Sequence, residues 1–156
     1  KLGKNYDENG DFAKNGNINL AILEQLNALN FYKKQHPKSL GIEFVNAEIF
    51  PLLKAETPEN VLATFTEHIA IQISKVFNEN QLKKVLVTGG GAFNAYLIEK
   101  LNEKTTSEII IPDEKIINFK EALIFALMGI LRLNNEVNVL CSATGSSANH
   151  SSGIIV

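Results

Sequence analysis

The chain has 156 residues, of which 45% are hydrophobic and 21% are charged, and its net charge is −2. This composition is typical of a globular domain, and it excludes a disordered chain and a membrane-embedded one. Lysine and arginine form no basic stripe along the sequence, so nucleic acid is not an expected partner.

The first half of the chain is predicted to be mainly helical. Residues 1–17 are polar and contain Asn-Gly turn signals. Apolar residues recur at helical spacing over 18–31, and the segment 41–53 suggests a short helix ended by Pro51. The sequence Thr-Pro-Glu supplies an N-cap, a proline for the first helical position and an acid for the positive end of the helix dipole. It predicts a long helix over 58–79.

Strands and helices alternate in the second half of the chain. A short apolar run predicts a buried strand over 85–87, three glycines follow at 89–91, and a helix is predicted over 95–101. A second strand is expected over 108–111 and a long helix over 119–133. The remaining segments are a Ser/Gly/Asn-rich loop over 142–153 and a terminal strand over 154–156. This order is typical of an α/β fold, and so few strands lead us to expect neighbouring strands upstream.

The three glycines lie between a predicted strand and a predicted helix. Glycine allows a positive φ and a close approach of the backbone to a ligand, and a helix N-terminus attracts anions. The turn Thr88–Asn94 is therefore a candidate phosphate-binding element, with a tight structural turn as the alternative. No Gly-Lys-Ser/Thr sequence follows, which excludes a P-loop. The spacing Gly89-x-Gly91-x-x-Asn94, with Asp113 after the next strand, leaves an NAD(P)-binding oxidoreductase domain open as a rival.

The same turn resembles the GGGAxN segment of the anhydro-N-acetylmuramic acid kinase family, within the actin/hexokinase/Hsp70-like kinase superfamily. Further segments are similar to that family in the same order along the chain. They are 6–10 (similar to YDxxG), 36–43 (PPKSTGRE), 120–126 (EAxAFA) and 142–145 (SVTGA). His36, Leu40 and Ile42 depart from the second of these patterns. The resemblance covers nearly all of the chain, and the ordered set is more specific than any motif except GGGAxN.

The resemblance implies a fold and a function. Residues 1–156 would form a single domain, most of the C-terminal lobe of an actin-like ATPase (ribonuclease H-like) fold, which is α/β and helix-rich here because part of its sheet lies upstream. The family opens the 1,6-anhydro bond of anhydro-N-acetylmuramic acid and phosphorylates O6 in cell-wall recycling. ATP, with its Mg²⁺, would bind at Gly89, Gly90, Gly91 and Asn94. The implied partners are the sugar, the N-terminal lobe of the same protein and a second copy in a homodimer. A non-catalytic nucleotide-binding module of the superfamily remains an alternative.

The resemblance also implies that the catalytic centre is incomplete in this chain. The family's general base, an Asp in a DTGPxN segment, is expected upstream of Lys1, so we expect no catalytic residue here and no activity from this chain alone. Met128 is the only methionine, which favours a piece of a longer protein. Cys141 is the only cysteine, so an internal disulfide is excluded, as in a reducing compartment. No apolar run is long enough to span a membrane and the start is too polar for a signal peptide, which favours the cytoplasm.

A few other polar residues are candidates for function. Glu121 opens the helix predicted over 119–133, where it either interacts with the helix dipole or, as the resemblance suggests, binds sugar hydroxyls. Lys38 and Ser39 either cap a turn or contact a ligand, and Asp7 is expected to be structural. The histidines have no metal-like spacing, so no protein metal site is expected; they are His36, His68 and His150.

Overall fold

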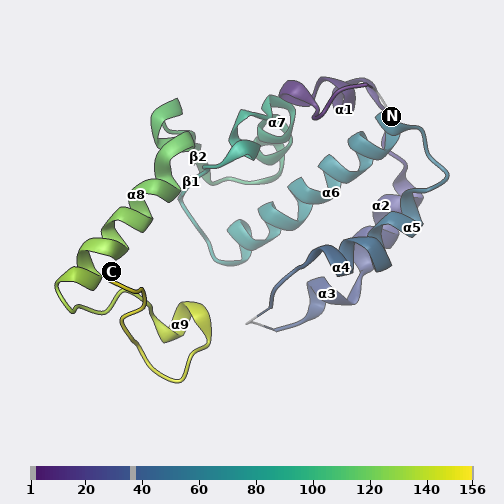
Figure 1. The fold of residues 1–156 in the computed structure, drawn as a ribbon. Helices are drawn as coiled ribbons and strands as arrows, with labels where there is room; N and C mark the ends of the chain where they lie inside the picture. Colours follow the sequence, from purple (N-terminus) through teal and green to yellow (C-terminus); the bar gives the residue numbers. More distant parts are fainter. Residues whose placement is uncertain (1–2, 36–37, 156) are drawn as a thin grey trace. The chain divides into compact units, whose positions relative to one another are not determined.

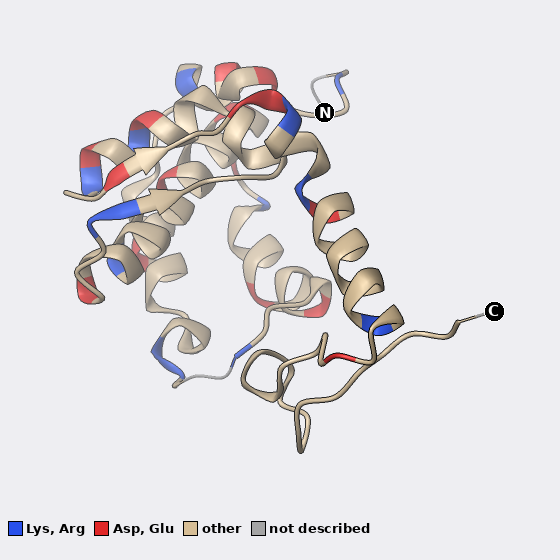
Figure 2. Cartoon of the chain, turned by 90° about the vertical axis from the view of Figure 1, so that its left-hand side faces the viewer, with Lys and Arg blue, Asp and Glu red and all other residues tan. Residues whose placement is uncertain are grey.

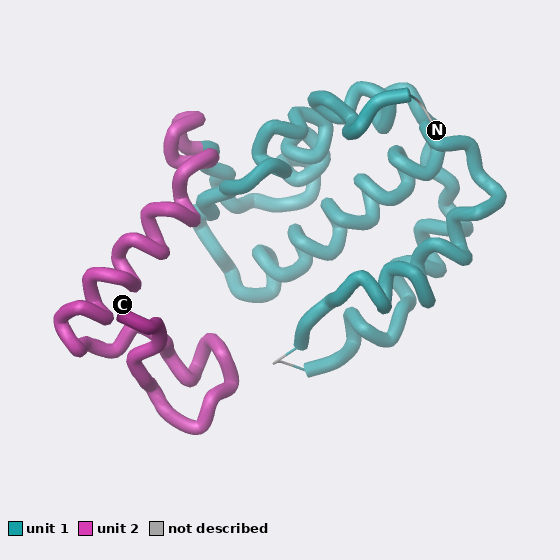
Figure 3. Tube along the Cα trace, in the orientation of Figure 1, with its two compact units in different colours: residues 1–111 teal, residues 112–156 magenta. Residues whose placement is uncertain are grey.

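The computed structural model describes residues 3–35 and 38–155 (Figure 1). His36 and Pro37, which belong to the segment similar to PPKSTGRE, lie outside the described residues, as does Val156 of the predicted terminal strand. The chain divides into two compact units, unit 1 (residues 1–111) and unit 2 (residues 112–156), shown in Figure 3. Each unit is described by itself.

Unit 1 begins with short helices. They are η1 (Glu8–Gly10), α1 (Asp11–Asn15), α2 (Leu20–Ala28) and α3 (Asn30–Lys33). The turn expected at Asn9-Gly10 is confirmed, because both residues have a positive φ, of 56° and 78°. The helix expected over 18–31 is divided at Leu29, whose ψ of 136° is not helical. The chain therefore turns between α2 and α3 at a point that the apolar spacing does not reveal.

The next helical segment continues through Pro51. It consists of α4 (Ile42–Phe44), a π-helical turn η2 (Val45–Ile49) and α5 (Phe50–Leu53). In the π turn the Phe50 N–H donates to the Val45 carbonyl, one residue further back than in an α-helix. Proline is tolerated in the first turn of α5, directly after this wider turn, because no α-helical hydrogen bond needs its missing N–H there. The expectation that Pro51 ends the helix was wrong.

The long helix α6 (Pro58–Glu79) is the centre of unit 1, and its predicted bounds are confirmed. Thr57 caps it by accepting a hydrogen bond from the Asn60 N–H at 3.4 Å. As Figure 1 shows, α6 runs between α1 and α7 on one side and α2 on the other, and it packs against all three. Its apolar side chains join a core cluster formed with α2, η2 and α5. The cluster contains buried Leu26, Ile49 and Leu53, with Val61 and Phe65 of α6 packed on it.

The sheet of unit 1 has two parallel strands among the described residues. The elements in this region are β1 (Lys84–Leu86), η3 (Gly90–Phe93), α7 (Ala95–Lys104) and β2 (Glu108–Ile110). The chain thus forms a strand–helix–strand unit, and the helix expected over 95–101 extends to Lys104. Leu86 is 59% exposed, so the expected burial of the first strand was wrong. Burial of a parallel strand needs cover on both faces of its sheet, and the described residues of unit 1 do not provide that cover at Leu86. A helix-rich α/β architecture is confirmed.

Unit 2 is built on α8 (Glu114–Leu133). This helix begins more than one turn before Phe119, where we expected its start. The reason is a cap, because the Asp113 carboxylate accepts a hydrogen bond from the Ile116 N–H at 3.0 Å. The apolar spacing identified the middle of the helix correctly and missed its polar first turn.

Most apolar side chains of α8 are exposed within the described residues. They are Ile116, Phe119, Leu123, Ile124, Phe125, Leu127, Ile130 and Leu133. Ile117 is the buried residue of this helix. The sequence of this helix has no charged residue between Glu121 and Arg132, and in Figure 2 the middle of the helix is accordingly tan. A helix that is apolar around much of its circumference is normally enclosed by other elements.

The tail after α8 is more ordered than the loop that we expected over 142–153. It contains α9 (Cys141–Thr144) and a bridge in which Val139 pairs with His150. The Asn138 amide donates to the carbonyls of Met128 and Ser152, which ties the tail to α8. The terminal strand was not confirmed, because 154–155 form no strand in the described part of the tail.

Candidate functional site

The glycine turn starts directly after β1. Gly89 has φ +83° and ψ 177°, a backbone conformation that side chains with a Cβ rarely adopt. The chain then forms the 3₁₀ turn η3, in which the Ala92 N–H donates to the Gly89 carbonyl at 3.0 Å. The Asn94 N–H donates to the Gly91 carbonyl at 3.1 Å, and α7 begins at the next residue. The predicted strand, turn and helix are therefore confirmed in that order.

The space around the three glycines is open. A Cβ atom added to Gly89 or to Gly90 would meet no atom of the described chain within 4 Å. On Gly91 it would meet Leu97 Cδ2 at 4.0 Å, an ordinary contact. Packing within the described residues therefore does not require glycine at Gly90 or Gly91, and the positive φ explains only Gly89. The open side of the turn leaves room for a ligand to approach the main chain.

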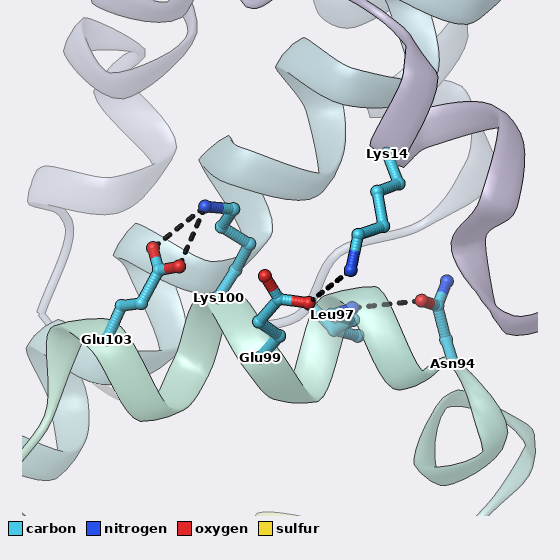
Figure 4. Close-up of polar contacts among 6 residues, drawn as sticks. All are labelled: Lys14, Asn94, Leu97, Glu99, Lys100 and Glu103. Atoms are coloured by element: carbon cyan, nitrogen blue, oxygen red, sulfur yellow. Dashed lines mark hydrogen bonds and ion pairs between the residues drawn. The ribbon is translucent and has the colours of Figure 1, made fainter.

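Asn94 has a structural role at the junction between the turn and α7. Its Oδ1 accepts a hydrogen bond from the Leu97 N–H at 2.9 Å, as Figure 4 shows. This is the geometry of an N-cap, and it satisfies one of the N–H groups that the first turn of a helix leaves without a partner. Asn94, the last residue of the Gly89-x-Gly91-x-x-Asn94 pattern, thus fixes the start of α7.

Sequence reasoning missed a residue that touches this junction, Gly10. It is buried, and a Cβ on it would lie 2.7 Å from the Cβ of Tyr96 and also overlap the side chain of Asn94. The turn signal at Asn9-Gly10 predicted the positive φ, but it could not reveal the contact of Gly10 with Asn94 and Tyr96. The segment similar to YDxxG and the segment similar to GGGAxN, far apart in sequence, therefore pack together in unit 1.

Two of the other candidate acids accept hydrogen bonds from backbone N–H groups, and the third is exposed. Asp113, the proposed ribose ligand of the dinucleotide alternative, caps α8. Glu121 is exposed and lies in the third turn of α8, so the expected interaction with the helix dipole was wrong; the acid of the first turn is Glu114. Asp7 is structural as expected, because its carboxylate accepts from the backbone N–H groups of Phe12 and Ala13 at 2.8 and 3.0 Å.

Lys38 follows α3 in the chain, and its side chain reaches the C-terminal end of that helix. Its Nζ donates to the carbonyls of Phe31 and Tyr32 at 3.5 and 3.3 Å, and lies 5.2 Å from the centroid of the Phe31 ring. The interaction with the last carbonyls of a short helix favours the capping interpretation of Lys38 over ligand contact.

Glu121 remains the candidate sugar-binding residue. It belongs to unit 2, whereas the glycine turn belongs to unit 1.

His68 is buried and fully paired. Its Nδ1 lies 2.7 Å from Asn27 Oδ1 and its Nε2 lies 2.8 Å from the Tyr32 hydroxyl. Asn27 Oδ1 also accepts from Gln72, so we assign the proton to Nδ1 and the lone pair to Nε2. Burial lowers the pKa of His68 to about 4, which keeps the ring neutral. Within residues 3–35 and 38–155 no group of three or more His, Cys, Asp or Glu side chains could hold a metal ion.

Comparisons with known proteins identify relatives of this chain. The family model described as anhydro-N-acetylmuramic acid kinase matches residues 1–156. An anhydro-N-acetylmuramic acid kinase of Francisella tularensis subsp. novicida is 31% identical over 94% of this chain and 42% of its own length. Those of Mannheimia succiniciproducens and Haemophilus influenzae are 32% and 33% identical, each over 98% of this chain and 45% of its own length.

The chain spans less than half the length of these curated relatives. No helix among the described residues is both long and apolar enough to cross a membrane. The family model nevertheless covers the chain from end to end, glycine turn included. The chain therefore belongs to the anhydro-N-acetylmuramic acid kinase family.

Proposed function

We propose that the full-length protein is an ATP-dependent kinase that opens and phosphorylates 1,6-anhydro-N-acetylmuramic acid in cytoplasmic cell-wall recycling. Family membership supports the reaction. The single observation that carries the assignment to this chain is the glycine turn after β1, where nothing in the described residues fills the space beside Gly90 and Gly91. In this proposal residues 1–156 are one domain, most of the C-terminal lobe of an actin-like ATPase fold.

The glycine turn is the proposed nucleotide site. Gly89, Gly90 and Gly91 expose main chain that the ribose and phosphates of ATP can approach, and Asn94 supports them from the start of α7. The dipole of α7 adds a favourable potential for the phosphates. A Mg²⁺ ion arriving with ATP would be held largely by phosphate oxygens and water, as this ion prefers.

The proposed chemistry divides between this chain and upstream residues. Water adds to C1 of the sugar, the C1–O6 bond breaks, and O6 takes the γ-phosphoryl group from ATP, with ADP as the leaving group. A general base must take the proton of the water, and we place that base, an Asp, upstream of Lys1. In this chain Glu121 would orient the sugar through its hydroxyl groups, since its carboxylate is exposed on α8.

The N-terminal lobe is the proposed partner of this chain within the same protein, and the whole protein would form a homodimer. Within unit 2 the apolar side chains of α8 are exposed, and within unit 1 Leu86 is 59% exposed. In this proposal the N-terminal lobe would supply strands to the sheet and apolar surface to α8.

The decisive experiment uses the full-length protein. Sugar-dependent release of ADP from ATP, with the phosphorylated sugar identified by mass spectrometry, is the expected result. Calorimetric titration with ADP and with NAD⁺ should show binding of ADP alone. Binding of NAD⁺ would favour the oxidoreductase alternative, and ADP binding without any turnover would favour a non-catalytic nucleotide-binding module.

A further inference from the structure

A compact turn near the start of unit 1 packs against the beginning of α7, directly after the glycine turn. We define the N-terminal turn as residues 7–14. The Asp7 carboxylate accepts from the N–H groups of Phe12 and Ala13, and the Asp7 carbonyl accepts from the Gly10 N–H at 3.2 Å. These hydrogen bonds hold the turn together from within, so it can act as a rigid support.

The N-terminal turn meets α7 where the helix begins. Gly10 is buried at φ +78°, and a Cβ there would come within 3 Å of Tyr96 Cβ and of Asn94 Oδ1. Asn94 Oδ1 is the atom that caps α7 through the Leu97 N–H. The absence of a Cβ at position 10 thus leaves the space in which the cap of α7 sits.

A second contact lies one helical turn further along α7. Lys14 Nζ lies 2.9 Å from Glu99 Oε2, and Figure 4 shows the lysine reaching down from the N-terminal turn to the helix. Both side chains are largely exposed, so this ion pair contributes little by itself. It marks the same orientation of the N-terminal turn on α7 as the Gly10 contact does.

We propose that Gly10 is a positioning residue for the nucleotide site, acting through Asn94. The Asn94 N–H donates to the Gly91 carbonyl, so a displacement of Asn94 displaces the glycine turn with it. The N-terminal turn therefore sets the position of the main chain that receives the nucleotide. This inference rests on the proposed function, in which Gly89–Gly91 bind ATP.

The test compares Gly10 with a glycine that also has a positive φ. Gly3 has φ +72° and a Cβ on it would meet no described atom within 4 Å. Gly10→Ala and Gly10→Val are made in the full-length protein beside Gly3→Ala and Gly3→Val. Both series introduce backbone strain because a side chain is placed at a positive φ, but only the Gly10 series displaces Asn94. We expect the Kd of ADP, measured by calorimetry, to rise at least about tenfold for Gly10→Val, with the KM of the sugar and the Gly3 variants unchanged.

A rescue variant separates positioning from general loosening of the fold. In Gly10→Ala/Asn94→Ser, serine keeps an oxygen that can cap α7 while removing the amide atoms that the new Cβ meets. We expect it to recover part of the ADP affinity that Gly10→Ala loses. Equal losses of ADP and sugar binding that follow the melting temperature, without rescue, would contradict the proposal. If Gly10→Val does not fold, Gly10→Ala and its rescue decide the question.

Gly91→Val distinguishes this inference from the proposed function. If Gly91→Val loses ADP and a folded Gly10→Val binds it as the parent does, Gly10 has no positioning role and the nucleotide site stands. If both variants bind ADP as the parent does, the nucleotide site is elsewhere and both proposals fail.

Discussion

Gly90 and Gly91 lack a Cβ without any steric need within the described chain, and neither has a positive φ. Gly91→Val should therefore abolish detectable ADP binding in the full-length protein, because its side chain occupies ligand space, and Gly90→Ala should weaken binding. The free energy of unfolding should change little. Calorimetric titration with ADP beside a melting curve measures both effects.

The contrasting control is Gly89→Ala. At φ +83° and ψ 177° its Cβ should cost about 1–3 kcal/mol of stability, which the Gly90 and Gly91 variants should not lose. A folded Gly91→Val protein with the ADP affinity of the parent would mean that the three glycines are only architectural.

His68 should make stability depend on pH. The pKa of His68 is about 4 in the folded state against 6.5 when exposed. Between these two pH values the imidazole is therefore protonated in the unfolded chain and neutral in the folded chain. Its contribution is constant above pH 6.5 and turns unfavourable as the pH falls from 6.5 towards 4. We expect the free energy of unfolding to fall by about 2 kcal/mol from about pH 7 to about pH 5 because of this residue. Urea titrations at each pH measure the slope.

His68→Gln should remove this part of the pH slope, although the variant itself is less stable because buried polar contacts are lost. The matched control is His150→Gln, since His150 is exposed. An unchanged slope in folded His68→Gln would show that another group is responsible.

Glu121→Gln should raise the sugar KM or lower kcat in the full-length enzyme while the Kd of ADP stays nearly unchanged, because the proposed contact is to sugar hydroxyls. Steady-state kinetics and calorimetry separate the two ligands. Glu114→Gln is the control, since Glu114 is the acid in the first turn of α8 and its loss should cost about 0.3–1 kcal/mol of stability without a kinetic effect. Unchanged kinetics for Glu121→Gln would exclude Glu121 from the sugar site.

At the scale of elements, α7 depends on its cap. Asn94→Ala should lower the free energy of unfolding by about 1 kcal/mol, because the Leu97 N–H loses its acceptor, and Asn94→Ser should retain most of that stability. Its effect on ADP affinity should be milder than that of Gly91→Val, because Asn94 acts through the helix. Urea unfolding and calorimetry of the two variants test this, and equal stability of Asn94→Ala and the parent would contradict the capping role.

Helix ends were predictable where a cap was explicit. The Thr-Pro-Glu sequence placed both α6 and its first residue correctly, because cap, proline and acid coincide. For α8 the same type of signal was present at Asp113, but an apolar periodicity that starts later drew the boundary to Phe119. At Pro51 local chemistry misled, because the π turn directly before the proline lets the helical segment continue through it.

The candidate site was predictable in part. The glycine turn is visible in the sequence because three consecutive glycines cost conformational entropy, so packing alone rarely accounts for them after an apolar run. The contact between Gly10 and Asn94 could not be predicted, since it joins residues far apart in the chain and arises only when α1 and α7 pack in the same unit. The position of Glu121 within α8 depended on the true start of the helix, which the periodicity did not give.

For the whole molecule, we expect the 156 residues alone to lack kinase activity. The proposed general base lies upstream, and loss of a general base alone typically costs about 10²- to 10⁴-fold in rate. The isolated chain, incubated with ATP and anhydro-sugar, should release no ADP beyond background, whereas the full-length protein should do so under the same conditions. Sugar-dependent turnover by the isolated chain at the full-length rate would contradict the proposed division of the site.

The exposed apolar surface of α8 also matters during synthesis. In the proposed arrangement the N-terminal lobe leaves the ribosome first, so the surface that covers α8 is already folded when α8 emerges. Its apolar side chains then face solvent only briefly. In that arrangement a chain without the upstream residues would keep α8 but lose its cover, and chaperones and proteases recognise such surfaces. The cellular lifetime of this part of the protein would thus report whether the rest of the chain is intact.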